Sequence, residues 1–425
     1  MRIALLFPGQ GSQYVGMGKK WFDQWDVARQ TFEESDEALG FALSKLCFEG
    51  DPETLTATEF AQPAILTASI AAYRVYKYNG GLTPDYLAGH SLGEISALVV
   101  SGAISFADAV RLVRLRGSLM TQSLGDNIGA MIAVSGCEEE QVRKLCRLHS
   151  TDESIAVISN YNSPNQLVVS GNKLAVERVE GALKKEGGEV VYLKVSAPFH
   201  SPLMEEAAHR FEEALKTIKY SDLQIPVISN IYAKPYQSKE TIVELLSRQI
   251  VEPVRWNGTM KFLVSKGIDT AVELGPKKIL KNLFKNYPSV RAFSFDLADD
   301  VEQWSALSVP EVQSERESKM KLISRCLAIA VCTRNRNWDN EAYERGVLMP
   351  YRRIKVLEEQ LETTGREPNY EELEEAMDML RSVFETKLTP EEEQRERFEQ
   401  LMRETNINQF QPNFIDMTGS RVLVE

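Results

Sequence analysis

The feature that most constrains the fold is a Gly-His-Ser-Leu-Gly motif at residues 89–93. The apolar run at 86–88 is typical of the end of a strand, and residues 94–100 are typical of a helix. Glycines on both sides permit a tight strand-to-helix turn that exposes Ser91, and the N–H groups of the helix point toward negative charge that develops there. The motif predicts an α/β fold with a serine nucleophile. The alternative is a serine that only caps the helix.

Two loops elsewhere in the sequence fit an active site built around Ser91. The chain opens with an apolar strand, Ile3–Phe7, which ends in the Pro-Gly-Gln-Gly-Ser-Gln sequence of residues 8–13. A loop at the carboxyl end of a strand can offer backbone N–H groups to a reacting oxygen. One of the four histidines, His200, lies on a loop with a proline on either side. It is a candidate base for Ser91, and the alternative is an ordinary surface histidine.

Charge and hydropathy exclude several classes of function. The formal net charge is −12, and residues 301–425 carry most of it, with 17 Lys or Arg and 25 Asp or Glu. Nucleic acids and anionic membranes bind basic surfaces, so neither is expected as a main partner. No run approaches the ~20 apolar residues of a membrane span, and the first apolar run is too short for a signal peptide. The five scattered cysteines suit reduced thiols, and we expect a cytoplasmic protein.

The pattern of strands and helices changes twice along the chain. Residues 1–127 alternate short apolar runs with helical periodicity, which is typical of an α/β unit with a mainly parallel sheet. Residues 128–197 follow the order βαββαβ, which is the signature of a ferredoxin-like fold. These two segments are therefore expected to form separate units.

Residues 299–425 form a run of helical patterns with few strand-like segments. Start signals mark three of the expected helices: a capping box that begins at Ser314, an N-cap at Asn369 and a Thr-Pro-Glu-Glu sequence at Thr389. The apolar faces of such helices must be buried. We expect an α-helical C-terminal extension that packs on itself and on the preceding units. The alternative is a docking surface for a partner protein or for a second copy of the chain.

Six segments occur in a family-specific order within the first 300 residues: Phe-Pro-Gly-Gln-Gly-Ser-Gln at 7–13, Gly-His-Ser-Leu-Gly-Glu at 89–94, Arg-Leu-Val-Arg-Leu-Arg-Gly at 111–117, Gly-Ala-Met at 129–131, Asn-Tyr-Asn-Ser-Pro at 160–164 and Pro-Phe-His-Ser at 198–201. Together they resemble the malonyl-CoA:acyl carrier protein transacylase family, the acyltransferases that load fatty acid and polyketide synthases. The resemblance implies a hydrolase-like large subdomain, residues 1–127 and 198–298, with the ferredoxin-like small subdomain, residues 128–197, inserted. The active site would lie in the cleft between them. The resemblance leaves residues 299–425 unassigned.

This resemblance implies roles in acyl transfer for five positions. Ser91 would be the nucleophile, and His200 the base that accepts the serine proton and returns it to a thiol. No carboxylate stands out as a third member, and the resemblance implies that the backbone carbonyl of Gln249 orients His200. The backbone N–H groups of Gln10 and Leu92 would form the oxyanion hole. A neutral orienting group stabilises an imidazolium less than a carboxylate does, which suits transfer between thiols more than amide cleavage.

Arg116 decides the class of acyl group in this interpretation. A guanidinium in the acyl pocket can bind a malonyl carboxylate through two parallel hydrogen bonds. An acetyl group would leave it unpaired, and an unpaired charge in an apolar pocket is costly. The alternative is that Arg116, like Arg111 and Arg114, is a cation on a solvated helix face. Of the other substrate-site candidates, His90 is expected to face the acyl carboxylate, and Phe199 fits the malonyl-type pattern of the family.

These expectations combine into a malonyl-CoA:acyl carrier protein S-malonyltransferase that works through a malonyl ester on Ser91. The C-terminal extension favours an enzyme that serves a polyketide or mixed polyketide–peptide synthase in trans over the housekeeping enzyme of fatty acid synthesis. A proofreading acyl hydrolase of the same fold is a second hypothesis, and Arg116 speaks against it. A third hypothesis is a non-catalytic scaffold, which the set of Ser91, His200, Arg116 and Gln10 disfavours.

The expected partner is an acyl carrier protein, and no metal or cofactor is expected. Tyr14 stands where the third glycine of a Gly-x-Gly-x-x-Gly fingerprint would stand, which disfavours a dinucleotide site. CoA phosphates and an acidic carrier protein would both be attracted by cations near the cleft. The candidate cations are Lys277, Lys278, Lys281 and Lys285.

Overall fold

The computed structural model describes residues 1–122, 129–195, 197–308, 315–405 and 407. The chain forms two compact units, Met1–Ser308 and Val309–Glu425. Three expectations fall outside the described residues: the boundary between residues 127 and 128, the capping residue Ser314, and the part of the extension that follows residue 407.

The large subdomain is built on a five-stranded parallel sheet, which confirms the predicted fold class. Its strands are β1 (Ile3–Phe7), β2 (Tyr86–Gly89), β7 (Val227–Ile228), β8 (Thr270–Glu273) and β9 (Arg291–Ser294), in the order β7-β2-β1-β8-β9. In β1, Ile3, Leu5 and Phe7 belong to one core cluster, whereas Ala4 and Leu6 belong to another. A parallel strand covered on both faces needs apolar residues at consecutive positions, which explains the unbroken apolar run in the sequence.

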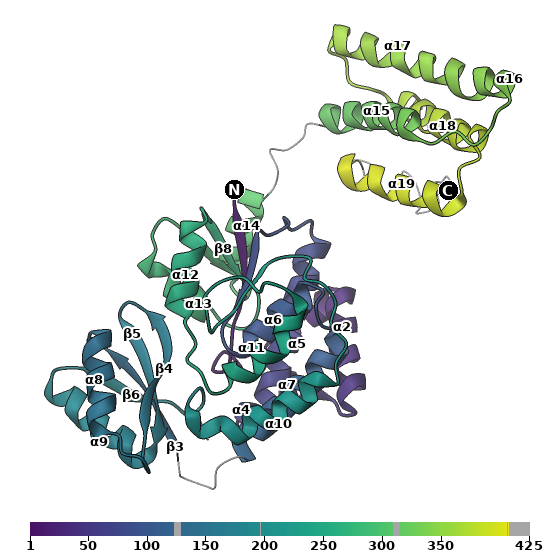
Figure 1. Ribbon diagram of the computed structural model, residues 1–425. Helices are drawn as coiled ribbons and strands as arrows, with labels where there is room; N and C mark the ends of the chain where they lie inside the picture. The colour runs from purple at the N-terminus through teal and green to yellow at the C-terminus, as the bar shows by residue number, and fades with distance from the viewer. Residues whose placement is uncertain (123–128, 196, 309–314, 406, 408–425) are drawn as a thin grey trace. The chain divides into compact units, whose positions relative to one another are not determined.

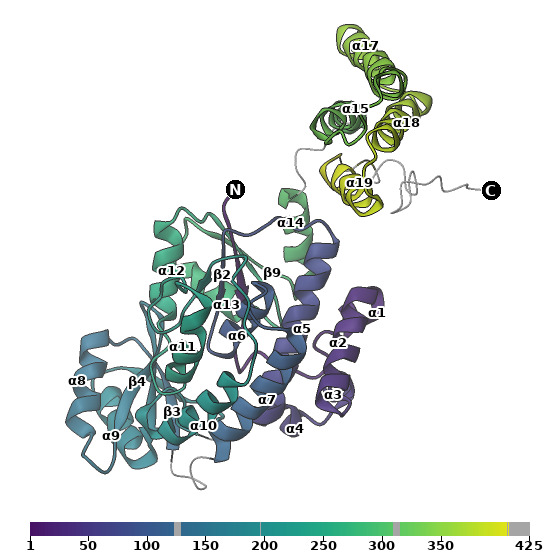
Figure 2. The ribbon, with the colours of Figure 1, turned by 45° about the vertical axis from the view of Figure 1, so that its right-hand side comes forward.

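Helices cover both faces of this sheet (Figures 1 and 2). Helices α5 and α6 supply the core cluster on one face and α12 the cluster on the other. The helices of the large subdomain are α1 (Lys19–Gln24), α2 (Asp26–Leu39), α3 (Leu43–Glu49), α4 (Pro52–Thr56), α5 (Thr58–Tyr78), α6 (Leu92–Val100), α7 (Phe106–Gln122), α10 (Glu205–Lys216), α11 (Ile242–Gln249), α12 (Trp256–Ser265), α13 (Ile279–Leu283) and α14 (Ala298–Ser308).

The register of the sheet brings two of the predicted site loops together. Strands β1 and β2 are parallel neighbours, and Phe7 is paired with Gly89 at the carboxyl ends of both. The loop at residues 8–13 and the turn that holds Ser91 therefore start side by side. This is the edge of a parallel sheet at which ligands usually bind.

The small subdomain has the βαββαβ order that the sequence predicted. Its elements are β3 (Gly129–Ser135), α8 (Glu139–His149), β4 (Ala156–Ser163), β5 (Gln166–Asn172), α9 (Lys173–Lys185) and β6 (Glu189–Tyr192). The strands form an antiparallel sheet in the order β4-β5-β3-β6. Helices α8 and α9 pack on one face of this sheet. Met131 and Val168, on the opposite face, join the core of the large subdomain.

The first unit extends beyond residue 298. Helix α14 belongs to Met1–Ser308, and its Trp304 is only 3% exposed. The indole stacks on Tyr76 with the ring centroids 5.9 Å apart, and Asp300 of the same helix pairs with Lys281 at 2.6 Å. The expected boundary between residues 298 and 299 therefore moves to 308/309, because a buried aromatic side chain and an ion pair tie α14 to the sheet.

The second unit has a hydrophobic core of its own. Its helices are α15 (Glu315–Cys332), α16 (Asn340–Tyr343), α17 (Met349–Thr364), α18 (Tyr370–Thr386) and α19 (Glu391–Thr405), with a π-helical turn at Glu344–Leu348. The apolar faces of these helices are buried against one another, through Leu322, Leu361, Leu380, Phe384 and Leu401 among others. The helical start signals at Asn369 and Thr389 are both confirmed.

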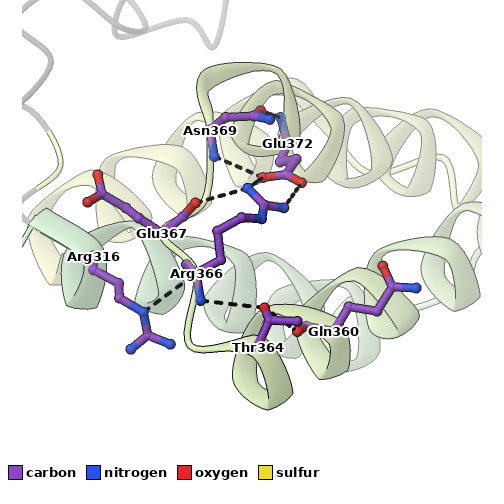
Figure 3. Close-up of polar contacts among 7 residues, drawn as sticks. All are labelled: Arg316, Gln360, Thr364, Arg366, Glu367, Asn369 and Glu372. Carbon is purple, nitrogen blue, oxygen red and sulfur yellow. Dashed lines mark hydrogen bonds and ion pairs between the residues drawn. The ribbon is translucent and has the colours of Figure 1, made fainter.

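The start of α18 shows how the sequence determines a helix boundary locally (Figure 3). The side chain of Asn369 accepts a hydrogen bond from the N–H of Glu372 at 3.0 Å, and the Glu372 carboxylate accepts one from the N–H of Asn369 at 2.8 Å. Arg366 donates to both oxygens of the same carboxylate, so the preceding loop is tied to the helix as well. An N-cap of this kind contributes about 1 kcal/mol to helix stability.

All five cysteines are free thiols, and Cys47, Cys146 and Cys326 are buried. Burial raises the pKa of the Cys146 and Cys326 thiols to about 12, so they stay protonated and unreactive at neutral pH. In the described part of the chain, no helix combines the length and the apolar character that crossing a membrane requires.

Candidate active site

The Gly-His-Ser-Leu-Gly motif forms a tight turn between β2 and α6. Ser91 has φ 51° and ψ −110°, a conformation that costs a non-glycine residue about 1–3 kcal/mol. Both glycines are required because neither position has room for a Cβ atom. A Cβ on Gly89 would lie 1.8 Å from the carbonyl carbon of Gly93, and a Cβ on Gly93 would lie 2.0 Å from the carbonyl oxygen of Phe7. The turn therefore packs closely against the end of β1 and holds Ser91 at the helix N-terminus.

Ser91 and His200 are hydrogen-bonded. The Oγ of Ser91 lies 2.8 Å from Nε2 of His200, and Nδ1 of the same ring lies 2.6 Å from the backbone carbonyl oxygen of Gln249. A carbonyl oxygen only accepts, so Nδ1 carries the proton and Nε2 presents its lone pair to the serine hydroxyl. The main chain at the end of α11 thus orients the ring, at the residue that the family resemblance implied.

The environment of His200 keeps its ring neutral. The residue is 4% exposed, and its backbone has φ 56°. Burial, together with the positive charge of Arg116, lowers the pKa of His200 to about 3. At neutral pH the imidazole is therefore unprotonated and able to accept a proton from Ser91.

The two expected oxyanion-hole residues line the same cavity as Ser91. Leu92 is the first residue of α6, where a backbone N–H has no carbonyl partner within the helix. Gln10 lies in the loop after β1, and its side chain donates to the hydroxyl of Thr58 at 3.1 Å. Their backbone N–H groups remain the predicted donors to a developing oxyanion.

Arg116 is not on a solvated face of α7, because it is only 1% exposed, whereas Arg111 of the same helix is exposed. One terminal nitrogen donates to Oε1 of Gln62 at 3.0 Å. The other donates to Oε1 of Gln249 at 2.9 Å and to Oγ of Ser91 at 3.2 Å. Burial lowers the pKa of Arg116 to about 10, so it stays charged at neutral pH. Its Nε is buried without a hydrogen-bond partner among the described residues.

A cavity of about 470 Å³ opens at Ser91 and is lined by both subdomains. Phe199 is buried and lines this cavity. His90 also lines it, but its Nε2 lies 2.9 Å from Oδ1 of Asn162 in β4, so this atom is not free for an acyl carboxylate. Nowhere in the described ranges are three His, Cys, Asp or Glu side chains grouped in a way that would hold a metal ion.

Sequence reasoning missed three buried polar residues at the site. Gln62 binds Arg116, and Asn230 accepts from the N–H of Ser91 at 2.7 Å while donating to the carbonyl oxygen of Gly89 at 2.7 Å. Glu94, in the first turn of α6, is 1% exposed. Glu94 is the one charged residue in the run Leu92–Val100. A charged residue within an apolar run could have indicated a buried polar residue at the site.

The four lysines expected to attract a carrier protein do not form one free set. Lys281 pairs with Asp300 at 2.6 Å, and the Nζ of Lys277 donates to the carbonyl oxygen of Gly11 at 3.0 Å. Lys278 and Lys285 are exposed. Helix α13 spans only Ile279–Leu283, so Lys277, Lys278 and Lys285 lie outside it.

Comparison with known proteins places this architecture in a family. The family model of the acyl transferase domain matches residues 4–323 of this chain. The chain belongs to the acyl transferase family. The matched residues include both subdomains and every candidate site residue named above.

Three acyl transferases illustrate how far the similarity extends. A malonyl CoA-acyl carrier protein transacylase of Bacillus subtilis is 37% identical over 393 residues, which are 92% of this chain and 98% of that protein. FabD from Acinetobacter baumannii is 41% identical with a TM-score of 0.70, over 72% of this chain and 98% of that chain. A malonyl-transacylase in complex with a type II PKS acyl-carrier protein is 38% identical with a TM-score of 0.70, over 72% of this chain and 100% of its own. The first of these also matches most of the C-terminal unit.

Proposed function

We propose that this acyl transferase moves a malonyl group from malonyl-CoA to the phosphopantetheine thiol of an acyl carrier protein. In the first half-reaction, the Ser91 oxygen attacks the thioester carbonyl carbon while its proton passes to Nε2 of His200. The N–H groups of Gln10 and Leu92 stabilise the oxyanion of the tetrahedral intermediate. The carbon–sulfur bond then breaks, the CoA sulfur takes the proton from His200, and a malonyl ester remains on Ser91.

The second half-reaction runs the same steps with the carrier thiol as the attacking group. The thiol gives its proton to His200, its sulfur attacks the ester carbonyl, and the Ser91 oxygen leaves with the proton returned by His200. The scheme uses no metal and no cofactor.

Release of free malonate instead of transfer to the carrier would indicate the proofreading hydrolase.

The observation that carries this proposal is the position of one oxygen atom. Oγ of Ser91 lies 2.8 Å from Nε2 of His200 and 3.2 Å from the buried guanidinium of Arg116. A base beside the nucleophile supports covalent acyl transfer, and a fixed cation beside it supports an acyl group that ends in a carboxylate. The relatives named as malonyl transacylases add support for the same substrate.

Replacement of Arg116 with alanine is expected to lower malonyl transfer roughly tenfold to more than a hundredfold, because charge-assisted hydrogen bonds contribute ~1.5–3 kcal/mol. Acetyl transfer should fall little or rise, since an acetyl group makes no use of the guanidinium. The measurement is kcat/KM with malonyl-CoA and with acetyl-CoA, and Arg111→Ala on the exposed face of α7 is the matched control. An unchanged ratio of the two activities in Arg116→Ala would contradict the carboxylate clamp.

We further propose that the carrier belongs to a polyketide or mixed polyketide–peptide synthase that the enzyme serves in trans. The support is the likeness to the malonyl-transacylase in complex with a type II PKS acyl-carrier protein, which is 38% identical, together with a C-terminal unit that the 72% match to FabD does not include in full. The likeness of the first unit to FabD favours the housekeeping alternative. Transfer rates to a fatty acid synthesis carrier and to carriers of a synthase without acyltransferase domains, measured side by side, separate the two. A preference for the fatty acid carrier would contradict the proposal.

Truncation should separate the chemistry from the C-terminal unit. A chain that ends at Ser308 keeps the core of the first unit, so it should malonylate Ser91 as the full chain does and lose only carrier selectivity. A chain that ends at Asp296 also loses Trp304, whose packing is expected to stabilise the fold by about 3–5 kcal/mol. Intact mass after incubation with malonyl-CoA and thermal denaturation measure the two effects. A folded 1–308 chain that cannot malonylate Ser91 would show that the C-terminal unit contributes to the active site.

A further inference from the structure

The reaction described above leaves one buried charge at the site without a role. The carboxylate of Glu94 accepts hydrogen bonds from Nε2 of Gln249 at 2.6 Å, from the N–H of Asn230 at 3.1 Å and from the hydroxyl of Tyr236. Burial raises the pKa of Glu94 to about 7, whereas the three hydrogen bonds and the charge of Arg116 favour the ionised form. The three donors provide the carboxylate with hydrogen bonds, but they do not explain why a charged residue is buried beside the active site.

The carboxylate of Glu94 and the carbonyl oxygen of Ser91, both of which only accept, determine which way the amide of Gln249 points. An ionised carboxylate only accepts hydrogen bonds, so the NH₂ group of Gln249 must face Glu94. The amide oxygen is then turned to the other side, where it accepts from Arg116 at 2.9 Å. A flipped amide would place its NH₂ group against a guanidinium that has only donors. Glu94 therefore sets the position of Arg116 through one intervening side chain.

Glu94 also compensates the charge of Arg116 without covering it. The carboxylate raises the pKa of Arg116 against the effect of burial, while its contact with the guanidinium runs through the Gln249 amide. A carboxylate of the protein in direct contact with the guanidinium would compete with an acyl carboxylate for the same donors. Because the contact runs through the neutral Gln249 amide, Glu94 supplies the counter-charge and leaves the guanidinium available to an acyl carboxylate.

The same carboxylate anchors the turn of the nucleophile. Gln249, held by Glu94, donates from Nε2 to the carbonyl oxygen of Ser91 at 3.1 Å. Asn230, whose N–H is bound by Glu94, accepts from the N–H of Ser91 at 2.7 Å. Both sides of the strained Ser91 peptide unit are thus tied to one carboxylate.

We propose that Glu94 is a positioning residue for acyl-group selectivity: it orients the Gln249 amide, and that amide holds the Arg116 guanidinium where a malonyl carboxylate can reach it. The proposal rests on the malonyl transfer proposed above. It predicts that the preference for malonyl-CoA over acetyl-CoA depends on the charge of Glu94, although Glu94 itself contacts neither acyl group.

The test is the selectivity ratio, kcat/KM for malonyl-CoA divided by that for acetyl-CoA, measured at pH 8, where Glu94 is ionised. Glu94→Gln keeps the volume but removes the charge and lets the new amide present either its oxygen or its NH₂ group to Gln249. We expect the ratio to fall about tenfold, mainly through a higher KM for malonyl-CoA, because a charged hydrogen bond in the relay is lost. In an Arg116→Ala background, Glu94→Gln should lower the ratio no further.

Tyr236→Phe is the matched control, since it removes a hydrogen bond to the same carboxylate on the side away from Gln249. It should lower Tm and leave the selectivity ratio unchanged. If Glu94→Gln does not fold, Gln249→Leu provides the same readout, because it keeps the backbone carbonyl that binds His200 and removes the amide. A folded Glu94→Gln or Gln249→Leu variant with the wild-type ratio would overturn the proposal. A wild-type chain that forms no malonyl ester, seen by intact mass, would instead remove the proposed function and this proposal with it.

Discussion

Replacement of Ser91 with alanine is expected to abolish both the covalent malonyl label and transfer to the carrier, a loss of about 10⁴-fold or more. Without Oγ no ester can form, and the residual rate would come from binding and from the oxyanion donors alone. The fold should persist, because alanine at φ 51° carries the same backbone cost as serine. Intact mass after incubation with malonyl-CoA, followed by peptide mapping, measures the label.

Ser221, an exposed serine of the same subdomain, gives the control for this experiment. Ser221→Ala should take up one malonyl group per chain, as the wild type does. A label that persists on Ser91→Ala protein would show that another side chain is the nucleophile.

Replacement of His200 with alanine is expected to lower turnover by about 10²–10⁴, with little change in KM, because the loss removes the base from the chemical step. His209→Ala, at an exposed position of α10, should leave turnover unchanged. Steady-state kinetics and Tm measure both variants. A folded His200→Ala variant with near-normal turnover would exclude this histidine as the base.

The pH dependence of the wild type gives a second check on His200. Its pKa in the folded chain, about 3, lies below the ordinary 6.5 because of burial and the charge of Arg116. The ring is then neutral on both sides of pH 6.5, so protonation of His200 should not cause the acylation rate to decline near that pH. Removal of the Arg116 charge raises the pKa of His200, so a wild-type decline near pH 6.5 that moves to higher pH without that charge would contradict the buried, neutral base.

Several features were predictable because they depend on residues close together in the sequence. The turn at Ser91 follows from glycines two positions away on each side, and the cap of α18 follows from Asn369 and Glu372. The alternation of β3 to β6 with α8 and α9 follows from local apolar periodicity. The place of α14 in the first unit was not predictable, because it depends on residues far apart in the sequence. Trp304 is part of the first unit because its ring stacks on Tyr76, which is far away in the sequence, and because Asp300 of the same helix pairs with Lys281.

The sequence by itself determined the fold class, the two subdomains, the helical extension and the motifs that carry Ser91, His200 and Arg116, since each is a short-range pattern. Only the tertiary structure decided that Arg116 is buried beside Ser91, that Lys281 pairs with Asp300, and that Glu94 connects to Arg116 through Gln249. Glu94 and Gln249 are 155 residues apart, and Ser91 and His200 are 109 residues apart. Contacts over such separations arise from strand register and helix packing, and a polar side chain gains its partners and its shifted pKa only when that packing removes water around it.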